Sequence, residues 1–196
     1  LIGENAGRAV LFFARALDFA LVKDNDNALL DLNRALFLDK DFVLAYFERA
    51  NLRFDLLMFE QSQNIQEEIQ LSAYSTKKTD EDKQSGSKLT PVGEEAFGAE
   101  YILVMQDYEK VLEIAPEFVY AWYNRGYIRF LQKDYRSALE DFNRAIELSP
   151  DFAEAWYNRG IIRIYLGERE NGLRDLSKAG ELGMYQAYNL IKRFTE

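Results

Sequence analysis

The chain has 196 residues, 48% of them hydrophobic, which is enough for one domain with a sizeable core or for an elongated array of repeats. It contains no cysteine and no histidine, so disulfide bonds, thiol chemistry and the commonest general base and metal ligand are excluded. The net charge of −9 disfavours nucleic acid as a partner, because phosphate binding requires a basic surface.

The N-terminal part shows no targeting or membrane signal. Its longest apolar run, Ala9–Val22, is interrupted by Arg15 and Asp18 and is too short to span a bilayer. No signal peptide is visible. Because the sequence begins with Leu1 rather than Met, we expect the natural N-terminus to lie upstream, and the sequence leaves the cellular compartment undetermined.

The C-terminal half contains an internal repeat. Trp122 and Trp156, the two tryptophans, lie 34 residues apart, and the Asn-Arg-Gly triplet at 124–126 recurs at the same separation at 158–160. A self-match at this period is typical of a helical repeat array. When the 34-residue period is applied to the whole chain, it predicts four repeats, 9–42, 43–118, 119–152 and 153–186, within a single domain of residues 1–196.

These repeats resemble the tetratricopeptide repeat (TPR) family, in which helix A carries Trp, Leu, Gly and Tyr, and helix B carries Ala, Phe, Ala and a closing Pro. The third repeat supplies the matching residues Trp122, Gly126, Tyr135, Ala138, Phe142, Ala145 and Pro150. It departs from the pattern at Arg125, where Leu is usual, and at Arg129, where Tyr is usual. The Asn-Arg-Gly motif resembles repeats of the bacterial type. The resemblance implies an all-α, right-handed superhelical solenoid of helix-turn-helix repeats.

The second repeat carries an insertion near residues 57–98, between its two helices. Residues 57–71 keep a helical spacing of apolar side chains. Residues 75–88 contain almost no apolar residue and are expected to be disordered. Thr90-Pro91 is typical of a helix start. We therefore expect two over-long helices that form an arm, with a flexible surface loop as the alternative.

The last residues predict a C-terminal capping helix over about residues 184–195. Apolar side chains recur there at helical spacing, at Tyr185, Tyr188, Ile191 and Phe194. Such a helix covers the last apolar face of a repeat array and presents a polar face to water.

Each repeat carries an arginine at the seventh place, on helix A, and an aspartate at the twenty-third place, on helix B. The pairs are Arg15–Asp31, Arg49–Asp107, Arg125–Asp141 and Arg159–Asp175. One hypothesis is a row of arginines that binds a carboxylate or phosphate. We favour structural ion pairs within the repeats, because the seventh place lies about 160° around the helix from the groove face that the family implies. Arg53, Arg129 and Arg163, one turn further along, are expected to pair between helices as well.

The groove face implied by the resemblance carries an aromatic residue at the fifth place of every repeat, with asparagines nearby. Such a surface suits an extended peptide, because aromatic rings provide contact area and asparagines can bond to the peptide backbone. The predicted partner-binding residues are Phe47, Asn51, Tyr120, Tyr123, Asn124, Tyr127, Tyr157, Asn158, Ile161 and Tyr165. Alternatively, these aromatic residues only pack between repeats. The face lacks the Lys and Arg of the C-terminal carboxylate clamp known from one TPR subgroup, so we reject that binding mode.

The inner face of the first repeat is wholly apolar. It carries Val10, Phe13, Ala14, Leu17 and Leu21. An exposed patch of this kind normally marks an interface. We expect upstream repeats, the inserted arm or a second copy of the chain to cover it.

The sequence shows no glycine-rich phosphate loop, no nucleophile–base pair and no cluster of metal ligands, so we expect no enzyme, no metal and no cofactor. The resemblance implies a non-catalytic scaffold that binds a protein or peptide segment in the concave TPR groove, with no nucleic acid and no transmembrane segment. The alternative is a structural or self-association module whose groove is filled by its own insertion or by a second copy, which leaves a homo-oligomer open. A carbohydrate stacked on the tyrosines is a third hypothesis.

Overall fold

The computed structural model describes residues 2–75 and 94–195, and within these residues all regular structure is helical. The helices are α1 (Ile2–Leu21), α2 (Asn25–Leu38), α3 (Val43–Ser75), α4 (Glu94–Ile114), α5 (Val119–Leu131), α6 (Tyr135–Leu148), α7 (Ala153–Tyr165), α8 (Arg169–Glu181) and α9 (Gln186–Thr195). The expected helix start at Thr90-Pro91, and all but the first residue of the expected disordered stretch 75–88, lie outside the described residues.

The chain forms two compact units, Leu1–Asp107 and Tyr108–Glu196, which we call unit 1 and unit 2. Unit 1 contains the α1–α2 hairpin, α3 and most of α4. Unit 2 contains the end of α4 and the helices from α5 to α9. Each unit is described by itself below.

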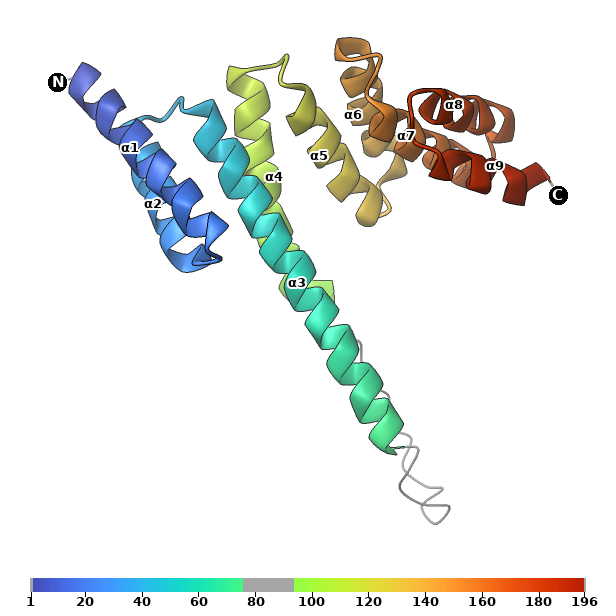
Figure 1. Cartoon of the computed structure of the whole chain (residues 1–196), viewed down its shortest axis with the longest axis horizontal. Coiled ribbons are helices and arrows are strands. Elements are labelled where there is room, and N and C mark those ends of the chain that lie inside the picture. Colours follow the sequence, from blue (N-terminus) through green and yellow to red (C-terminus); the bar gives the residue numbers. More distant parts are fainter. Residues whose placement is uncertain (1, 76–93, 196) are drawn as a thin grey trace. The chain divides into compact units, whose positions relative to one another are not determined.

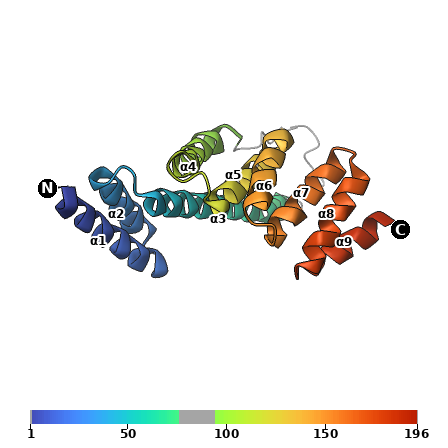
Figure 2. The same ribbon diagram turned by 90° about the horizontal axis from the view of Figure 1, so that it is seen from above.

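Antiparallel helical hairpins build both units. The helices of each hairpin pack on each other, α1 on α2, α5 on α6 and α7 on α8, and each second helix then packs on the next helix along the chain. Figure 1 shows α1 beside α2 and α8 beside α9, and the turned view in Figure 2 agrees. Fully buried alanines recur at these contacts, at Ala28, Ala35, Ala45, Ala121, Ala138, Ala145, Ala155 and Ala179. Small side chains let the helices approach closely, so each repeat buries its apolar face against its neighbours.

The turns inside three hairpins share one backbone geometry. Helix A is followed by a residue with positive φ, 62° at Lys23, 62° at Lys133 and 87° at Gly167, which is the left-handed conformation that commonly ends a helix. Asp24 and Asp134 then cap the next helix by accepting a hydrogen bond from the backbone N–H three residues later. The hairpins are thus specified by local sequence.

The helices around the insertion are longer than those of the other hairpins. Helix α3 has 33 residues and α4 has 21, whereas α5 and α7 have 13 each. Phe54 of α3 lies with its ring centroid 6.4 Å from that of Tyr101 of α4, and Gln61 Nε2 lies 3.4 Å from the Tyr101 hydroxyl. In Figure 1, α3 continues well beyond the end of the α1–α2 hairpin.

Helix α9 covers the last hairpin of unit 2. Ala187 is fully buried, and Leu190 and Ile191 pack against the cluster that contains Leu176 and Ala179. The ring of Tyr188 lies on Gly180, where an added Cβ would be 2.5 Å from the tyrosine Cζ. The C-terminal helix therefore closes the apolar face of α8 in the way a terminal cap does.

We predict that Gly160→Ala destabilises unit 2 by about 1–3 kcal/mol, because an added Cβ would lie 2.9 Å from the backbone oxygen of Gly172 and backbone cannot rotate away. The roughly 1 kcal/mol that alanine gains over glycine in a helix does not offset this. Urea unfolding followed by the fluorescence of Trp122 and Trp156, both in unit 2, measures the change. Gly7→Ala in unit 1, followed by circular dichroism, is the control, since nothing lies within 4 Å of its added Cβ. A Gly160→Ala protein as stable as the wild type would contradict the prediction.

Candidate functional site

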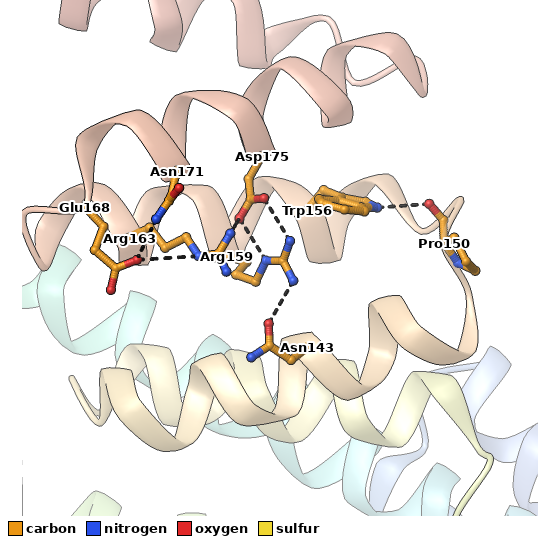
Figure 3. Close-up of polar contacts among 8 residues, drawn as sticks. All are labelled: Asn143, Pro150, Trp156, Arg159, Arg163, Glu168, Asn171 and Asp175. Atoms are coloured by element: carbon orange, nitrogen blue, oxygen red, sulfur yellow. Dashed lines mark hydrogen bonds and ion pairs between the residues drawn. The ribbon is translucent and has the colours of Figure 1, made fainter.

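In unit 2, each buried aspartate of helix B accepts hydrogen bonds from two arginines of helix A. Asp141 binds Arg125 through Nε (3.1 Å) and Nη2 (2.7 Å), and Arg129 through Nη1 (2.8 Å). In the next repeat, Asp175 binds Arg159 through Nε and Nη2 (both 2.8 Å) and also the Nη1 of the second arginine, Arg163 (2.8 Å) (Figure 3). Two-pronged arginine–carboxylate contacts of this kind fix orientation as well as distance.

Unit 1 repeats this arrangement with one change of partner. Asp107 binds Arg49 through Nε (2.9 Å) and Nη2 (2.6 Å), and also binds Arg53 (2.7 Å). Asp31 binds Nε and Nη2 of Arg15, and its second cation is Arg34 from its own helix α2 (2.8 Å). Phe19 occupies the place that an arginine holds in the other repeats, so helix B supplies the second guanidinium.

An aromatic ring lies beneath each seventh-place arginine, one turn earlier on helix A. The guanidinium carbon is 4.8 Å from the Trp122 ring centroid in the third repeat and 4.5 Å from that of Trp156 in the fourth, within the range of a cation–π contact. Each indole N–H also donates to the carbonyl of the preceding loop proline, Pro116 (2.8 Å) or Pro150 (2.9 Å). The two tryptophans therefore anchor the arginine and tie the entering loop to helix A.

The seventh-place arginine also contacts the preceding repeat, which the sequence analysis missed. Arg49 Nη1 donates to Asn33 Oδ1 at 2.6 Å, and Arg159 Nη1 donates to Asn143 Oδ1 at 2.8 Å (Figure 3). An available signal was the recurrence of Asn at the twenty-fifth place of the first and third repeats. One guanidinium thus links two helices of its own repeat to the previous hairpin.

Burial of the seventh-place arginine differs between the first and the third repeat. The side chain of Arg15 is 52% exposed, whereas that of Arg125 is 12% exposed. The hydrogen bond from Arg15 lowers the pKa of Asp31 below its ordinary value. Burial raises the pKa of Asp141, against the opposing effect of Arg125 and Arg129. The same ion pair is therefore much more enclosed in the third repeat than in the first.

Seven aromatic rings of unit 2 form a continuous series of contacts, which we call the aromatic row. Successive ring centroids lie 4.7–6.5 Å apart. The order is Tyr120, Phe152, Tyr123, Tyr127, Phe130, Tyr135 and Tyr165. The two ends are open to solvent, with Tyr120 60% exposed and Tyr165 70% exposed. Four of the five predicted partner-binding tyrosines, at 120, 123, 127 and 165, thus belong to one connected set.

The predicted asparagines of unit 2 hold tyrosines. Asn158, which is 8% exposed, donates through Nδ2 to the Tyr123 hydroxyl at 3.1 Å. Asn124 Nδ2 donates to the Tyr108 hydroxyl at 3.2 Å. Burial raises the pKa of Tyr123 to about 12, because removal from water disfavours the charged phenolate. These amides orient aromatic rings inside the protein, a role that the sequence analysis did not assign to them.

The other predicted residues of unit 2, Tyr157 and Ile161, are partly buried. Both pack on the cluster of Leu176, Ala179 and Ala187. Their side chains therefore contribute to the contact of α7 with α8 and α9. This is the packing role that the sequence analysis kept as the alternative for the aromatic residues.

In unit 1, the predicted residues Phe47 and Asn51 lie on α3 and are partly buried. Asn51 lines a pocket of about 550 Å³ formed by α1, α2, the turn between them and α3. Two carboxylates, Glu48 and Asp55, share this pocket, and burial raises the pKa of both. Asn51 donates a side-chain hydrogen bond to Glu48, which partly offsets the shift.

Residues 2–75 and 94–195 show neither a metal-binding cluster nor a membrane-spanning helix. These residues contain no group of three or more acidic, histidine or cysteine side chains that could hold a metal ion. None of the described helices combines the length and the apolar character needed to cross a bilayer.

Comparisons with known proteins match one repeat to a family and the fold to solved structures. Residues 119–152 match the sequence profile of the family described as Tetratricopeptide repeat. The MamA RS-1 ArsTM double mutant superposes with a TM-score of 0.63 at 13% identity, covering 91% of this chain and 76% of that one. MamA 41-end from Desulfovibrio magneticus RS-1 gives 0.62 at 13% identity, covering 91% and 77%. A crystal structure of MamA gives 0.62 at 14% identity, covering 92% and 81%. No curated protein sequence matches the chain.

The fold is an all-α TPR solenoid. In TPR terms, the two departures of the third repeat, Arg125 and Arg129, are the arginines that bind Asp141. At the two places where the family pattern has Leu and Tyr, this chain has arginines that pair with an aspartate of helix B. The charges of both arginines are balanced within the repeat by hydrogen bonds to the carboxylate of Asp141 on helix B.

We predict that Asp141→Asn costs about 3–5 kcal/mol of unfolding free energy, because it leaves Arg125 and Arg129 enclosed without their carboxylate. Asp31→Asn should cost under about 2 kcal/mol, because Arg15 and Arg34 are about half exposed and remain hydrated. Urea unfolding monitored by circular dichroism compares the two variants, and tryptophan fluorescence reports unit 2 separately. If Asp141→Asn unfolded at the same urea concentration as the wild type, the ion pair would not be a stabilising element.

Glu48→Gln is expected to raise the stability of the folded chain at pH 7. A carboxyl whose folded-state pKa is raised disfavours folding once it ionises, so its cost is absent below the ordinary value of 4.5 and grows as the pH rises. The gain of the glutamine variant should therefore shrink between pH 7 and pH 4. Urea unfolding of both proteins at the two pH values checks this, and a Gln variant less stable than the wild type at pH 7 would contradict it.

Proposed function

We propose that the chain is a non-catalytic TPR scaffold that binds a partner peptide or protein segment in the concave groove of its repeats. We infer that residues 1–196 form one domain of four repeats, 9–42, 43–118, 119–152 and 153–186, followed by the capping helix. We also infer from the Asn-Arg-Gly motifs that the repeats are of the bacterial type. The observation that carries it is the aromatic row of unit 2, with both ends exposed.

The exposed ends of the row are already ordered by ring contacts. Tyr165 stacks on Tyr135 at an interplanar angle of 2°, and Tyr120 meets Phe152 edge to face with centroids 5.6 Å apart. Tyrosine offers a flat apolar surface together with a hydroxyl that can bond to a polar partner. A side chain that is ordered before binding loses less conformational entropy when a partner docks. Tyr120 and Tyr165 are therefore the residues that we expect a partner to contact first.

The inner members of the row have a supporting role in this proposal. Tyr123 packs on Phe142 and Phe152, and its hydroxyl is held by Asn158. Substituting it would disturb the core of the third repeat as well as the surface. A binding test should therefore change the two exposed ends of the row and leave Tyr123 and Asn158 intact.

The second candidate function, self-association, is favoured by the apolar face of α1. On this face Val10 is 55%, Leu17 42% and Leu21 83% exposed. Exposed apolar side chains that gather on one helix often mark an interface between chains. A second copy of the chain would cover them and make the module a homo-oligomer.

The binding proposal predicts that Tyr120→Ala/Tyr165→Ala abolishes capture of a partner while the fold is kept. The wild type, this double variant and Tyr185→Ala are immobilised, extract of the source cells is passed over each, and retained proteins are identified by mass spectrometry. Tyr185 is the matched control, because it is 75% exposed and lies outside the aromatic row. Circular dichroism confirms that all three proteins are folded.

A protein retained by the wild type and the control but lost by the double variant supports the aromatic row as the binding surface. Equal retention by all three proteins would contradict it. No retention by any of them, together with a dimer in sedimentation velocity that Leu21→Glu dissociates, would replace peptide binding by self-association.

A further inference from the structure

The pocket of unit 1 has a chemistry different from that of the aromatic row. Its volume is about 550 Å³, within the usual size of ligand-binding sites. It lies between the α1–α2 hairpin and α3, all of which belong to unit 1. Within α3, its lining includes both acidic and apolar residues at helical spacing, among them Glu48, Leu52, Asp55 and Phe59.

The apolar part of the lining is open to a partner. Phe59 on α3 is 61% exposed, and Leu17 on α1 is 42% exposed. Leu52, between the two carboxylates, is partly buried and packs on the core of the first hairpin. Aliphatic side chains of a partner could therefore bury area against α1 and α3 together.

The two carboxylates are not neutralised within the described residues. The ion pairs of unit 1 in residues 2–75 and 94–107 occupy Asp31 and Asp107, and none reaches Glu48 or Asp55. Lys23, in the turn after α1, is the one cation among the lining residues, so the pocket carries more negative than positive charge. Partial desolvation raises the pKa of both carboxyls, which is relieved when a cation approaches.

We propose that this pocket receives a lysine or arginine side chain of a partner segment, between Glu48 and Asp55, with aliphatic neighbours of that residue resting on Leu17 and Phe59. The inference rests on the proposed scaffold function and adds the chemistry of the segment that unit 1 selects. An acidic segment would be repelled by the two carboxylates. A purely apolar segment would bury them without a partner, which is unfavourable. A basic side chain flanked by aliphatic ones satisfies both parts of the lining.

The test uses a phage-displayed library of random dodecapeptides selected on the full chain. Selections on the wild type, on Glu48→Gln/Asp55→Asn and on Tyr120→Ala/Tyr165→Ala are run in parallel. Both carboxylate substitutions keep the shape of the side chain and remove its charge. All peptides that the wild type retains are synthesised with a fluorescent label, and their affinities for the three proteins are measured by anisotropy.

We expect one class of these peptides to carry Lys or Arg beside aliphatic residues. Peptides of this class should bind Glu48→Gln/Asp55→Asn at least about ten-fold more weakly than the wild type, because two charge contacts are removed. Replacing the basic residue of the peptide by norleucine should cause a similar loss, and added salt should weaken wild-type binding. Lys23→Gln should bind them as tightly as the wild type or more tightly, because it removes the one positive charge of the lining.

A selection that yields no peptides with basic residues, or only basic peptides that bind the carboxylate variant as well as the wild type, would overturn the inference. If every retained peptide depends only on Tyr120 and Tyr165, the pocket inference fails and the proposed scaffold function stands. Peptides that depend only on Glu48 and Asp55 support the pocket and move recognition away from the aromatic row. If no peptide depends on either set of residues, both proposals fail.

Discussion

The structure depends on one repeated interaction, a helix-B aspartate held by two arginines. At the contacts between paired helices, small residues such as Ala138 and Gly126 allow close approach, and large side chains such as Phe142 fill the space beside them. The carboxylate of Asp141, 1% exposed, binds in two prongs only when both helices stand at the right height and rotation. The ion pair therefore sets the register of each hairpin. The ion pair contributes mainly by fixing this register, because the cost of desolvating the buried charges offsets much of their electrostatic attraction.

The same guanidinium extends order beyond its own hairpin. Arg159 lies over Trp156, binds Asp175 and reaches Asn143 of the preceding repeat. Coupling between neighbours is what stabilises a repeat array, because no single repeat can bury its apolar face alone. The recurring arginines, which the sequence alone allowed as a site for a carboxylate or phosphate, therefore pair with aspartates of the same chain. Recognition of a partner is left to other residues of helix A.

The surfaces that remain differ between the two units. Unit 2 offers aromatic rings that are already ordered, from Tyr120 to Tyr165. Unit 1 offers carboxylates set among aliphatic and aromatic side chains around Asn51. The rigid hairpins hold both surfaces in place, so a partner segment would lose less entropy on binding than it would on flexible loops. On the two proposals above, a partner would carry a basic, aliphatic-flanked stretch for unit 1 and apolar or aromatic contacts for unit 2.

The sequence by itself determined the repeat period, the all-α fold class and which arginines and aspartates recur at matching places. These features are local or periodic, and a helix converts sequence spacing directly into position on a face. Tertiary structure alone decided that Asn124 and Asn158 hold tyrosine hydroxyls and that Tyr157 packs inward. It also decided that Leu17 and the carboxylates of α3 share one pocket. Such contacts join residues on different helices. Which residues meet depends on how the helices pack, and the periodic pattern within one helix does not specify that packing.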